Sequence, residues 1–322
     1  MPVNADKTQS WKADIAASVD LYNQWFITFA PKAYRQTREK VTRQVEAALK
    51  STEYLRDISP VLLREHPEVL PILRMATAPP IARDRLIGLA GVAPTLVQCM
   101  EDKRMIPPRM SDGLLEEQLA KIGAMIARLA DKDILPWLDT PNKPGKKELY
   151  RASTIVADRL CGAVANPIIR NAQEARQLAS IRAWLETRGY KLIPTGSHMT
   201  IRTLQPGTFC FRLNVAITNE SGKSVNVPVD AAIMPKGAAI GSLPLLLEAK
   251  SAGDYTNTNK RRKEEATKIA QLRRTYGKKV VFVLFLCGYF DSGYLGYEAA
   301  EGIDWVWEHR IDDLAMFGLG HD

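Results

Sequence analysis

Three side chains in the second half of the chain have types and a spacing that can perform chemistry together. Asp230 ends the extended segment 225–230, and 18 residues later Glu248-Ala-Lys250 ends an apolar segment. Alternate residues of a strand project to the same face, so Glu248 and Lys250 are expected to point together. If the two segments pair as strands, Asp230 joins them. The sequence therefore predicts a site with two carboxylates beside one ammonium group.

The chemistry that these groups predict is metal-dependent hydrolysis of a phosphodiester bond. Two carboxylates form a hard-oxygen site for Mg²⁺, which keeps several waters and lies beside phosphate groups. The Lys250 ammonium can orient an attacking water or neutralise charge that builds on the phosphoryl oxygens. The bare pattern also arises by chance in many chains. The alternative interpretation is a solvated strand end with one surface ion pair.

An acidic side chain on the preceding helix is a candidate for a further metal ligand. Glu174 lies well inside the predicted helix 171–188, whereas Glu186 lies close to Gly189, where that helix is expected to end. Glutamates of this kind most often lie on the surface, so both also have a structural interpretation as exposed charges. Of the two, we predict Glu174 as the further ligand.

The basic charge of the chain is concentrated in one segment. The 322 residues include 44 Lys and Arg and 36 Asp and Glu, which gives a net charge of +8 and a pI near 9.2. Residues 260–279 contain nine basic and two acidic side chains, a local charge of +7. Such a cluster is either a solvated helix face or a contact surface for a polyanion.

The place of this cluster in its predicted helix favours phosphate contact. Residues 257–259, Asn-Thr-Asn, are typical of a helix start, which puts the first four basic residues in the first turn. The helix macrodipole disfavours cations there, so the arrangement costs local stability. Phosphates can bind both these cations and the N-terminal amides. The predicted DNA-binding residues are Lys260, Arg261, Arg262, Lys263 and Lys268.

The elements that must position these residues divide the chain into two regions. Residues 1–150 show helical periodicity, with breaks expected at prolines such as Pro31, and no strand pattern. The loop 139–147, with two prolines, one glycine and three lysines, is the predicted boundary before a second domain, 151–322. Strand patterns there cover 190–193, 208–218, 224–233, 243–250 and 279–287, with a helix over 260–276 and a tight turn in the glycine-rich segment 288–296.

This order of elements predicts an α/β (α+β) fold, with a mixed sheet flanked by helices after an N-terminal helical region. The longest apolar run, Val280–Cys287, is too short for a transmembrane helix, and the first residues lack the apolar core of a signal peptide. The four cysteines are scattered and form no Cys-x-x-Cys motif. They are expected to be reduced thiols, and the chain is expected to be cytoplasmic and not bound to a membrane.

Several segments resemble the XamI-type restriction endonucleases, which belong to the PD-(D/E)XK nucleases. The short core is Asp230 with Glu248-Ala-Lys250, which many nucleases share. The more specific strings run almost from end to end, in 11–34, 158–163, 247–254, 257–265 and 302–307. One departure from the motif is that Pro228 precedes Asp230 by two positions rather than one. The proline has a structural role and the Asp230 carboxylate performs the chemistry, so this departure does not affect the catalytic assignment.

This resemblance implies a type II restriction enzyme that depends on Mg²⁺ and cuts both strands of duplex DNA at a short palindrome, expected to be GTCGAC. By position, Asp230 and Glu248 would bind metal, and Lys250 would assist the nucleophilic water. A palindromic target implies a two-fold symmetric homodimer. The region 1–150 would serve DNA recognition, dimerisation or both, and a cognate DNA methyltransferase would protect host DNA.

Two other functions remain open from the residues themselves. One is a repair or structure-specific nuclease with the same core, which would cut without a fixed sequence. The other is a DNA-binding protein without catalysis, in which the acidic residues only end their strands. A discrete digestion pattern distinguishes the restriction enzyme from the first, and metal-dependent turnover distinguishes it from the second.

Overall fold

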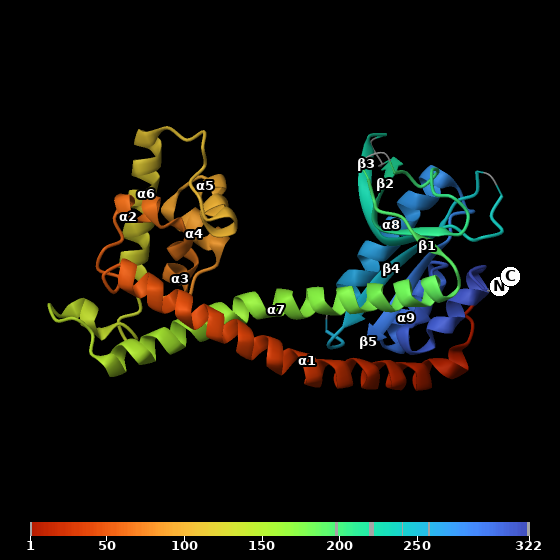
Figure 1. The fold of residues 1–322 in the computed structure, drawn as a ribbon, viewed down its shortest axis with the longest axis horizontal. Coiled ribbons are helices and arrows are strands. Elements are labelled where there is room, and N and C mark those ends of the chain that lie inside the picture. Colours follow the sequence, from red (N-terminus) through yellow and green to blue (C-terminus); the bar gives the residue numbers. More distant parts are fainter. Residues whose placement is uncertain (1, 197–198, 219–221, 240, 257, 321–322) are drawn as a thin grey trace. The chain divides into compact units, whose positions relative to one another are not determined.

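The computed structural model describes residues 2–196, 199–218, 222–239, 241–256 and 258–320, with the side chains of 258–262 outside that description. The chain forms two compact units, one of Met1–Phe29 with Arg170–Asp322 and the other of Ala30–Ile169. This division differs from the predicted boundary near residue 150, although the loop expected there does precede a helix. Two long helices, α1 (Thr8–Ser51) and α7 (Lys146–Thr187), each contribute residues to both units (Figure 1).

Both long helices continue through a proline. Pro31 lies inside α1 and Pro167 lies inside α7. A proline within a helix removes one main-chain hydrogen bond and favours a kink, but it does not oblige the helix to end. The predicted break at Pro31 was therefore wrong, and the predicted helix 171–188 is the second part of the longer helix α7.

The unit of Ala30–Ile169 is helical, as the sequence predicted for most of this region. Several of its short helices have a proline in the first two positions, where a missing N–H costs no intrahelical bond. Their apolar sides enclose one core that includes Leu49, Leu73 and Ile122. The elements are α2 (Pro60–Glu65), η1 (Pro67–Val69), α3 (Leu70–Met75), α4 (Arg83–Ala90), α5 (Pro94–Gln98), the π-helix η2 (Cys99–Lys103), α6 (Asp112–Leu129) and η3 (Pro136–Asp139).

The other unit contains a mixed sheet, which confirms the predicted α/β fold class. Within the described residues the sheet has six strands in the order β1-β2-β3-β4-β5-β6. The central pairs β2–β3 and β3–β4 are antiparallel, whereas β1–β2, β4–β5 and β5–β6 are parallel. The strands are β1 (Lys191–Leu192), β2 (Thr208–Thr218), β3 (Ser224–Ile233), β4 (Leu245–Ala252), β5 (Phe282–Gly288) and β6 (Asp304–Trp307).

Helices cover both faces of this sheet. Residues of α7 and of the 3₁₀ segment η4 (Glu308–Phe317) pack with Leu247 on one face. Residues of α8 (Thr258–Tyr276) and α9 (Ser292–Ala300) pack with Leu246 on the other. Side chains alternate along a strand, so Glu248 and Lys250 share the α8 face with Leu246. The sheet thus directs the candidate residues toward the basic helix.

The glycine-rich segment 288–296 is not the tight turn that the sequence predicted. Its second part begins α9, and the Asp291 side chain caps that helix by accepting a hydrogen bond from the backbone N–H of Tyr294 at 2.7 Å. An Asp at this position satisfies an N–H that a helix start leaves unpaired. The capping residue therefore determines where α9 begins, while Gly288, with a φ of 99°, ends β5 at a place where a Cβ would lie 2.1 Å from the Ala252 carbonyl oxygen.

Two expectations from composition can be compared with the structure. The four cysteines, Cys99, Cys161, Cys210 and Cys287, are free thiols. In the part of the chain that the structure describes, no helix has the length and apolarity needed to span a membrane.

Candidate active site

The junction of β3 and β4 brings the three predicted residues together. Ala231 pairs with Leu247 at the last paired position of these antiparallel strands, so the next residues in register are Asp230 and Glu248. Beyond this point the strands separate, and the Asp230 carboxylate accepts a hydrogen bond from the backbone N–H of Ala249 at 2.8 Å. Asp230 therefore lies across this opening between the two strands from Glu248, although Asp230 itself does not line the pocket described below.

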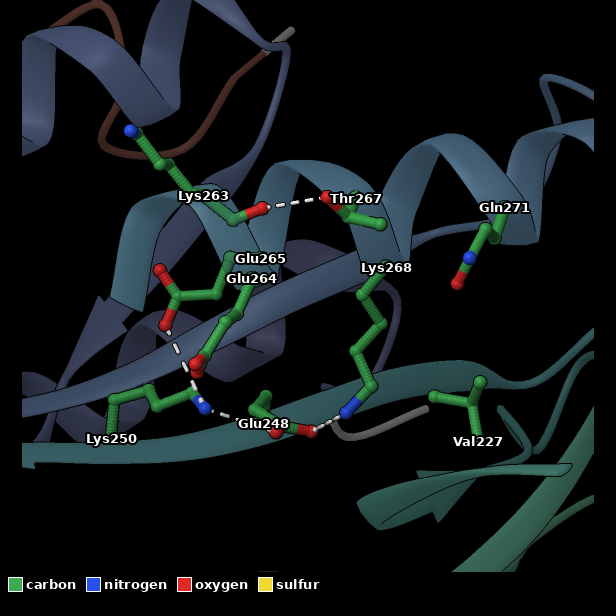
Figure 2. A pocket seen from close by; sticks show the side chains of 9 residues that line it. All are labelled: Val227, Glu248, Lys250, Lys263, Glu264, Glu265, Thr267, Lys268 and Gln271. Atoms are coloured by element: carbon green, nitrogen blue, oxygen red, sulfur yellow. Dashed lines mark hydrogen bonds and ion pairs between the residues drawn. The ribbon is translucent and has the colours of Figure 1, made fainter. Parts of the chain in front are cut away.

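The Glu248 carboxylate is held between two ammonium groups, which approach it from opposite sides (Figure 2). Lys250 Nζ lies 3.1 Å from Glu248 Oε1, and Lys268 Nζ lies 2.6 Å from Glu248 Oε2. All three side chains are largely buried, with exposed fractions of 22% for Lys250, 14% for Lys268 and 11% for Glu248. Partial burial weakens solvent screening, so these ion pairs are stronger than those of an open surface.

A second, deeper carboxylate lies behind Lys250. Glu265 of α8 is 1% exposed at its side chain, and its Oε1 lies 3.7 Å from Lys250 Nζ. Its other oxygen accepts a hydrogen bond from the Tyr294 hydroxyl at 2.5 Å. The Lys250 ammonium is thus placed between Glu248 and Glu265, which restricts where it can point.

These side chains line an open pocket between the sheet and α8. The pocket has a volume of about 480 Å³ (Figure 2). The sheet provides one wall, and α8 provides the other with both charged and polar side chains. The lining residues are Val227, Glu248, Lys250, Lys263, Glu264, Glu265, Thr267, Lys268 and Gln271.

Burial and the neighbouring carboxylates raise the proton affinity of Asp230, while the lysine stays charged. Burial, together with the negative charges of Glu248 and Glu174, raises the pKa of Asp230 to about 6. Burial alone would lower the pKa of Lys250, but the negative charges of Glu248 and Glu265 outweigh it, so that pKa is raised. The site therefore combines an ammonium that is protonated at neutral pH with carboxylates whose mutual repulsion a bound cation would relieve.

Glu174 and Arg212 form a pair beside Asp230. Arg212 Nη2 lies 2.9 Å from Glu174 Oε1, and the charge of Glu174 is close enough to contribute to the raised pKa of Asp230. The β2–β3 ladder pairs Phe211 with Ala231 and Leu213 with Val229, but it omits the pair between them, Arg212 and Asp230. Arg212 has a positive φ of 54°. The backbone is therefore strained directly opposite Asp230.

Comparison with known proteins assigns the chain to a family. The model of the XamI restriction endonuclease family matches residues 53–307. The chain belongs to this family. It is also 54% identical over 318 residues to the Type II restriction enzyme SalI of Streptomyces albus G, an alignment that covers 98% of this chain and 99% of that protein. No solved structure matches the chain.

A restriction endonuclease is a site-specific deoxyribonuclease, so the substrate of this chain is DNA. Type II restriction endonucleases generally need a divalent metal ion. In the described part of the chain, no group of three or more His, Cys, Asp and Glu side chains is arranged to hold a metal. Asp230 and Glu248 nevertheless fit such an ion, because one or two carboxylates are enough when waters and substrate phosphates complete the shell.

The other predicted residues of this restriction endonuclease have different surroundings. Glu186 pairs with Arg182 on the surface, at 2.8 Å, whereas Glu174 lies near Asp230. Of the predicted DNA-binding side chains, Lys263 lines the pocket and Lys268 contacts Glu248. Lys260, Arg261 and Arg262 are the third to fifth residues of α8, but their side chains lie outside the described residues.

Sequence reasoning missed Glu265, Tyr294 and Arg212. Glu265 lies in the charged segment of α8, where the sequence predicts that acidic side chains are solvated. It is buried instead, and its carboxylate contacts Tyr294, which is distant in the sequence. A positive φ at an arginine has no sequence signal, because glycine is the usual residue there. The spacing of Glu265, three residues before Lys268, is the one available hint, since side chains at that spacing lie on one helix face.

The strain at Arg212 gives a testable prediction. Arg212→Gly and Arg212→Ala both lose the ion pair with Glu174, but only glycine relieves the positive φ. We expect the glycine variant to be more stable than the alanine variant by about 1 kcal/mol. Urea denaturation of both variants measures the difference. Equal stabilities would show that the strained backbone is not relieved by removing Cβ.

Proposed function

We propose that this restriction endonuclease hydrolyses both strands of duplex DNA at the palindrome GTCGAC, with Mg²⁺ as its cofactor. The observation that carries the assignment of the site is the convergence of Asp230, Glu248 and Lys250 at the opening between β3 and β4, under the basic helix α8. The recognition sequence is the one that membership of this family implies. Near-complete alignment with a type II restriction enzyme supports that extension.

The roles of the residues follow from their chemistry. Asp230 and Glu248 would hold the metal ion, with Glu174 as a further ligand or as a charge that orients Asp230. When bound, a divalent ion supplies an acidic water and neutralises phosphate charge. Lys250 stays protonated between two carboxylates, so its N–H groups can orient the attacking water or stabilise the charge that develops on the phosphoryl oxygens.

The basic helix would hold the DNA backbone close to this opening. Lys263 already lines the pocket, and Lys260, Arg261 and Arg262 begin the same helix. Cations in a first turn disfavour the isolated helix but are well placed for phosphate contact, together with the backbone amides there. These contacts position the duplex without reading its sequence.

A two-fold symmetric target calls for two copies of the active site. We propose a homodimer in which each subunit cuts one strand, with the helical region 1–150 serving dimerisation, DNA recognition or both. Protection of host DNA requires a cognate methyltransferase that modifies the same palindrome. The pair would act in the cytoplasm, where the free thiols of the chain remain reduced.

The deciding experiment is digestion of a sequenced plasmid with and without Mg²⁺, run beside Lys250→Ala. We expect discrete fragments that end at GTCGAC, which disappear without metal and in the variant. Fragments that map to another fixed sequence would reject the proposed palindrome. A smear would indicate a nuclease without sequence preference, and absence of cleavage of unmethylated DNA by folded protein would favour a DNA-binding protein without catalysis.

A further inference from the structure

Lys268 is more deeply buried than a lysine that only contacts DNA at the protein surface needs to be. Its side chain is only 14% exposed, and its Nζ lies 2.6 Å from Glu248 Oε2, closer than the 3.1 Å of Lys250 Nζ from the other oxygen. The ammonium also lies 6.0 Å from the centre of the ring of Phe282, the first residue of β5. Both partners of this ion pair are thus largely shielded from solvent, so the contact belongs to the structure of the site rather than to a flexible surface.

This ion pair competes with the proposed role of Glu248. Lys250 takes one oxygen of the Glu248 carboxylate and Lys268 takes the other, at 3.1 and 2.6 Å. A divalent ion on that carboxylate would lie within a few ångströms of the Lys268 ammonium, and like charges so close repel strongly in a partly buried site. Lys250 is restrained by Glu265 behind it, whereas Lys268 makes no comparable second ion pair among the described contacts.

We propose that Lys268 is an internal counter-ion for Glu248, which a divalent metal ion displaces, so that metal binding releases the ammonium to contact a DNA phosphate. The inference rests on the proposed metal-binding role of Glu248. The pocket beside α8, of about 480 Å³, leaves room for the released side chain (Figure 2). Metal and DNA would then bind cooperatively, because each favours the state in which Lys268 has left Glu248.

The first test measures metal affinity without DNA and without turnover. Mn²⁺ is titrated into the full chain, and free Mn²⁺ is read by electron paramagnetic resonance. Lys268→Met keeps an unbranched side chain and removes the charge, so we expect it to bind Mn²⁺ about tenfold more tightly than the wild type. Lys279→Met is the control, because it removes the same charge from an exposed side chain just after α8 that does not line the pocket. We expect its Mn²⁺ affinity to stay within about twofold of the wild type.

The second test measures the release of Lys268 to DNA. The salt dependence of binding to a duplex that lacks GTCGAC counts phosphate contacts, at about one unit of slope for each cation. With Ca²⁺ present, the wild type should have a slope about one unit steeper than Lys268→Met. Without a divalent ion the two slopes should agree. A difference that is the same with and without Ca²⁺ would contradict release by metal.

A third measurement tests the proposal on the wild type, so it remains decisive even if Lys268→Met does not fold. Lys268→Arg keeps the charge and serves to assign the Lys268 ammonium signal in ¹H–¹⁵N spectra of the wild type. We expect that signal to be visible in metal-free protein and to move or broaden on addition of Mg²⁺. An unchanged signal at saturating Mg²⁺ would overturn the proposal.

These results separate the inference from the function on which it rests. If the wild type binds Mn²⁺ and loses it on Asp230→Asn, but Lys268→Met binds no more tightly, the counter-ion role is rejected and the metal site stands. If the wild type neither binds Mn²⁺ nor cuts DNA, the metal site itself is rejected.

Discussion

Replacing Asp230 with Asn should abolish DNA cleavage and at the same time make the protein more stable at pH 8. Asparagine has nearly the same shape, and its carbonyl oxygen can still accept the hydrogen bond from the N–H of Ala249. It removes the negative charge that the proposed metal ion needs, so turnover should fall by about 10³-fold or more. It also removes a carboxylate that burial and its acidic neighbours disfavour, which is the source of the added stability.

The pH dependence of this stability change has a definite sign. Folding raises the pKa of Asp230 from 3.8 to about 6, so between these values the folded state binds more protons than the unfolded state. The cost of ionised Asp230 is therefore fully present above pH 6 and is lost as the pH falls toward 4. A pKa raised by about two corresponds to about 3 kcal/mol of lost stability. Part of this cost comes from repulsion that Asp230 shares with Glu248, so we expect the free energy of unfolding of Asp230→Asn to exceed that of the wild type by about 2 kcal/mol at pH 8.

Thermal unfolding of the wild type and Asp230→Asn at pH 8 and pH 4.5 measures this effect. We expect the variant to unfold a few degrees higher at pH 8, with a much smaller difference at pH 4.5. Asp291→Asn is a suitable control, because it changes a helix-capping carboxylate outside the site, and asparagine also caps helices. A lower unfolding temperature for Asp230→Asn at pH 8 would show that Asp230 stabilises the fold and is not held at a cost for function.

The strands that carry the site could be predicted closely because their patterns are local. β2 and β3 have the predicted bounds, 208–218 and 224–233, since apolar residues alternate with others on a half-buried sheet. β5 was recognised from a continuous apolar run, as expected for a strand covered on both faces. From these strands the sequence predicted that Asp230 joins Glu248 and Lys250 if the two segments pair.

What the sequence could not predict depends on contacts between distant residues. The two-unit division was not predicted, because α1 and α7 each continue through a proline, Pro31 and Pro167, and contribute residues to both units. The partner of Lys250 is similarly non-local, because Glu265 is buried only where α9 brings the Tyr294 hydroxyl to it. Composition of α8 alone indicates a charged, exposed helix.

Replacing Lys250 with Met should abolish cleavage and also destabilise the fold, and we expect these two effects to have separate causes. Lys250→Met removes the nearest cation from Glu265, a carboxylate that is 1% exposed, and so leaves a buried charge without its counter-ion. We expect a loss of about 2 to 3 kcal/mol in the free energy of unfolding. Turnover should fall by about 10³-fold, because the ammonium that acts on the developing phosphoryl charge is gone.

The double variant Lys250→Met with Glu265→Gln separates these two effects. Glutamine keeps a hydrogen-bond acceptor for Tyr294 and removes the buried charge, so most of the lost stability should return while cleavage remains absent. Urea denaturation and plasmid cleavage, measured on the wild type, both single variants and the double variant, complete the cycle. If the double variant recovered cleavage along with stability, Lys250 would be a structural partner of Glu265, and another group would have to act at the phosphate. If neither returned, burial of Glu265 would not be what couples Lys250 to the fold.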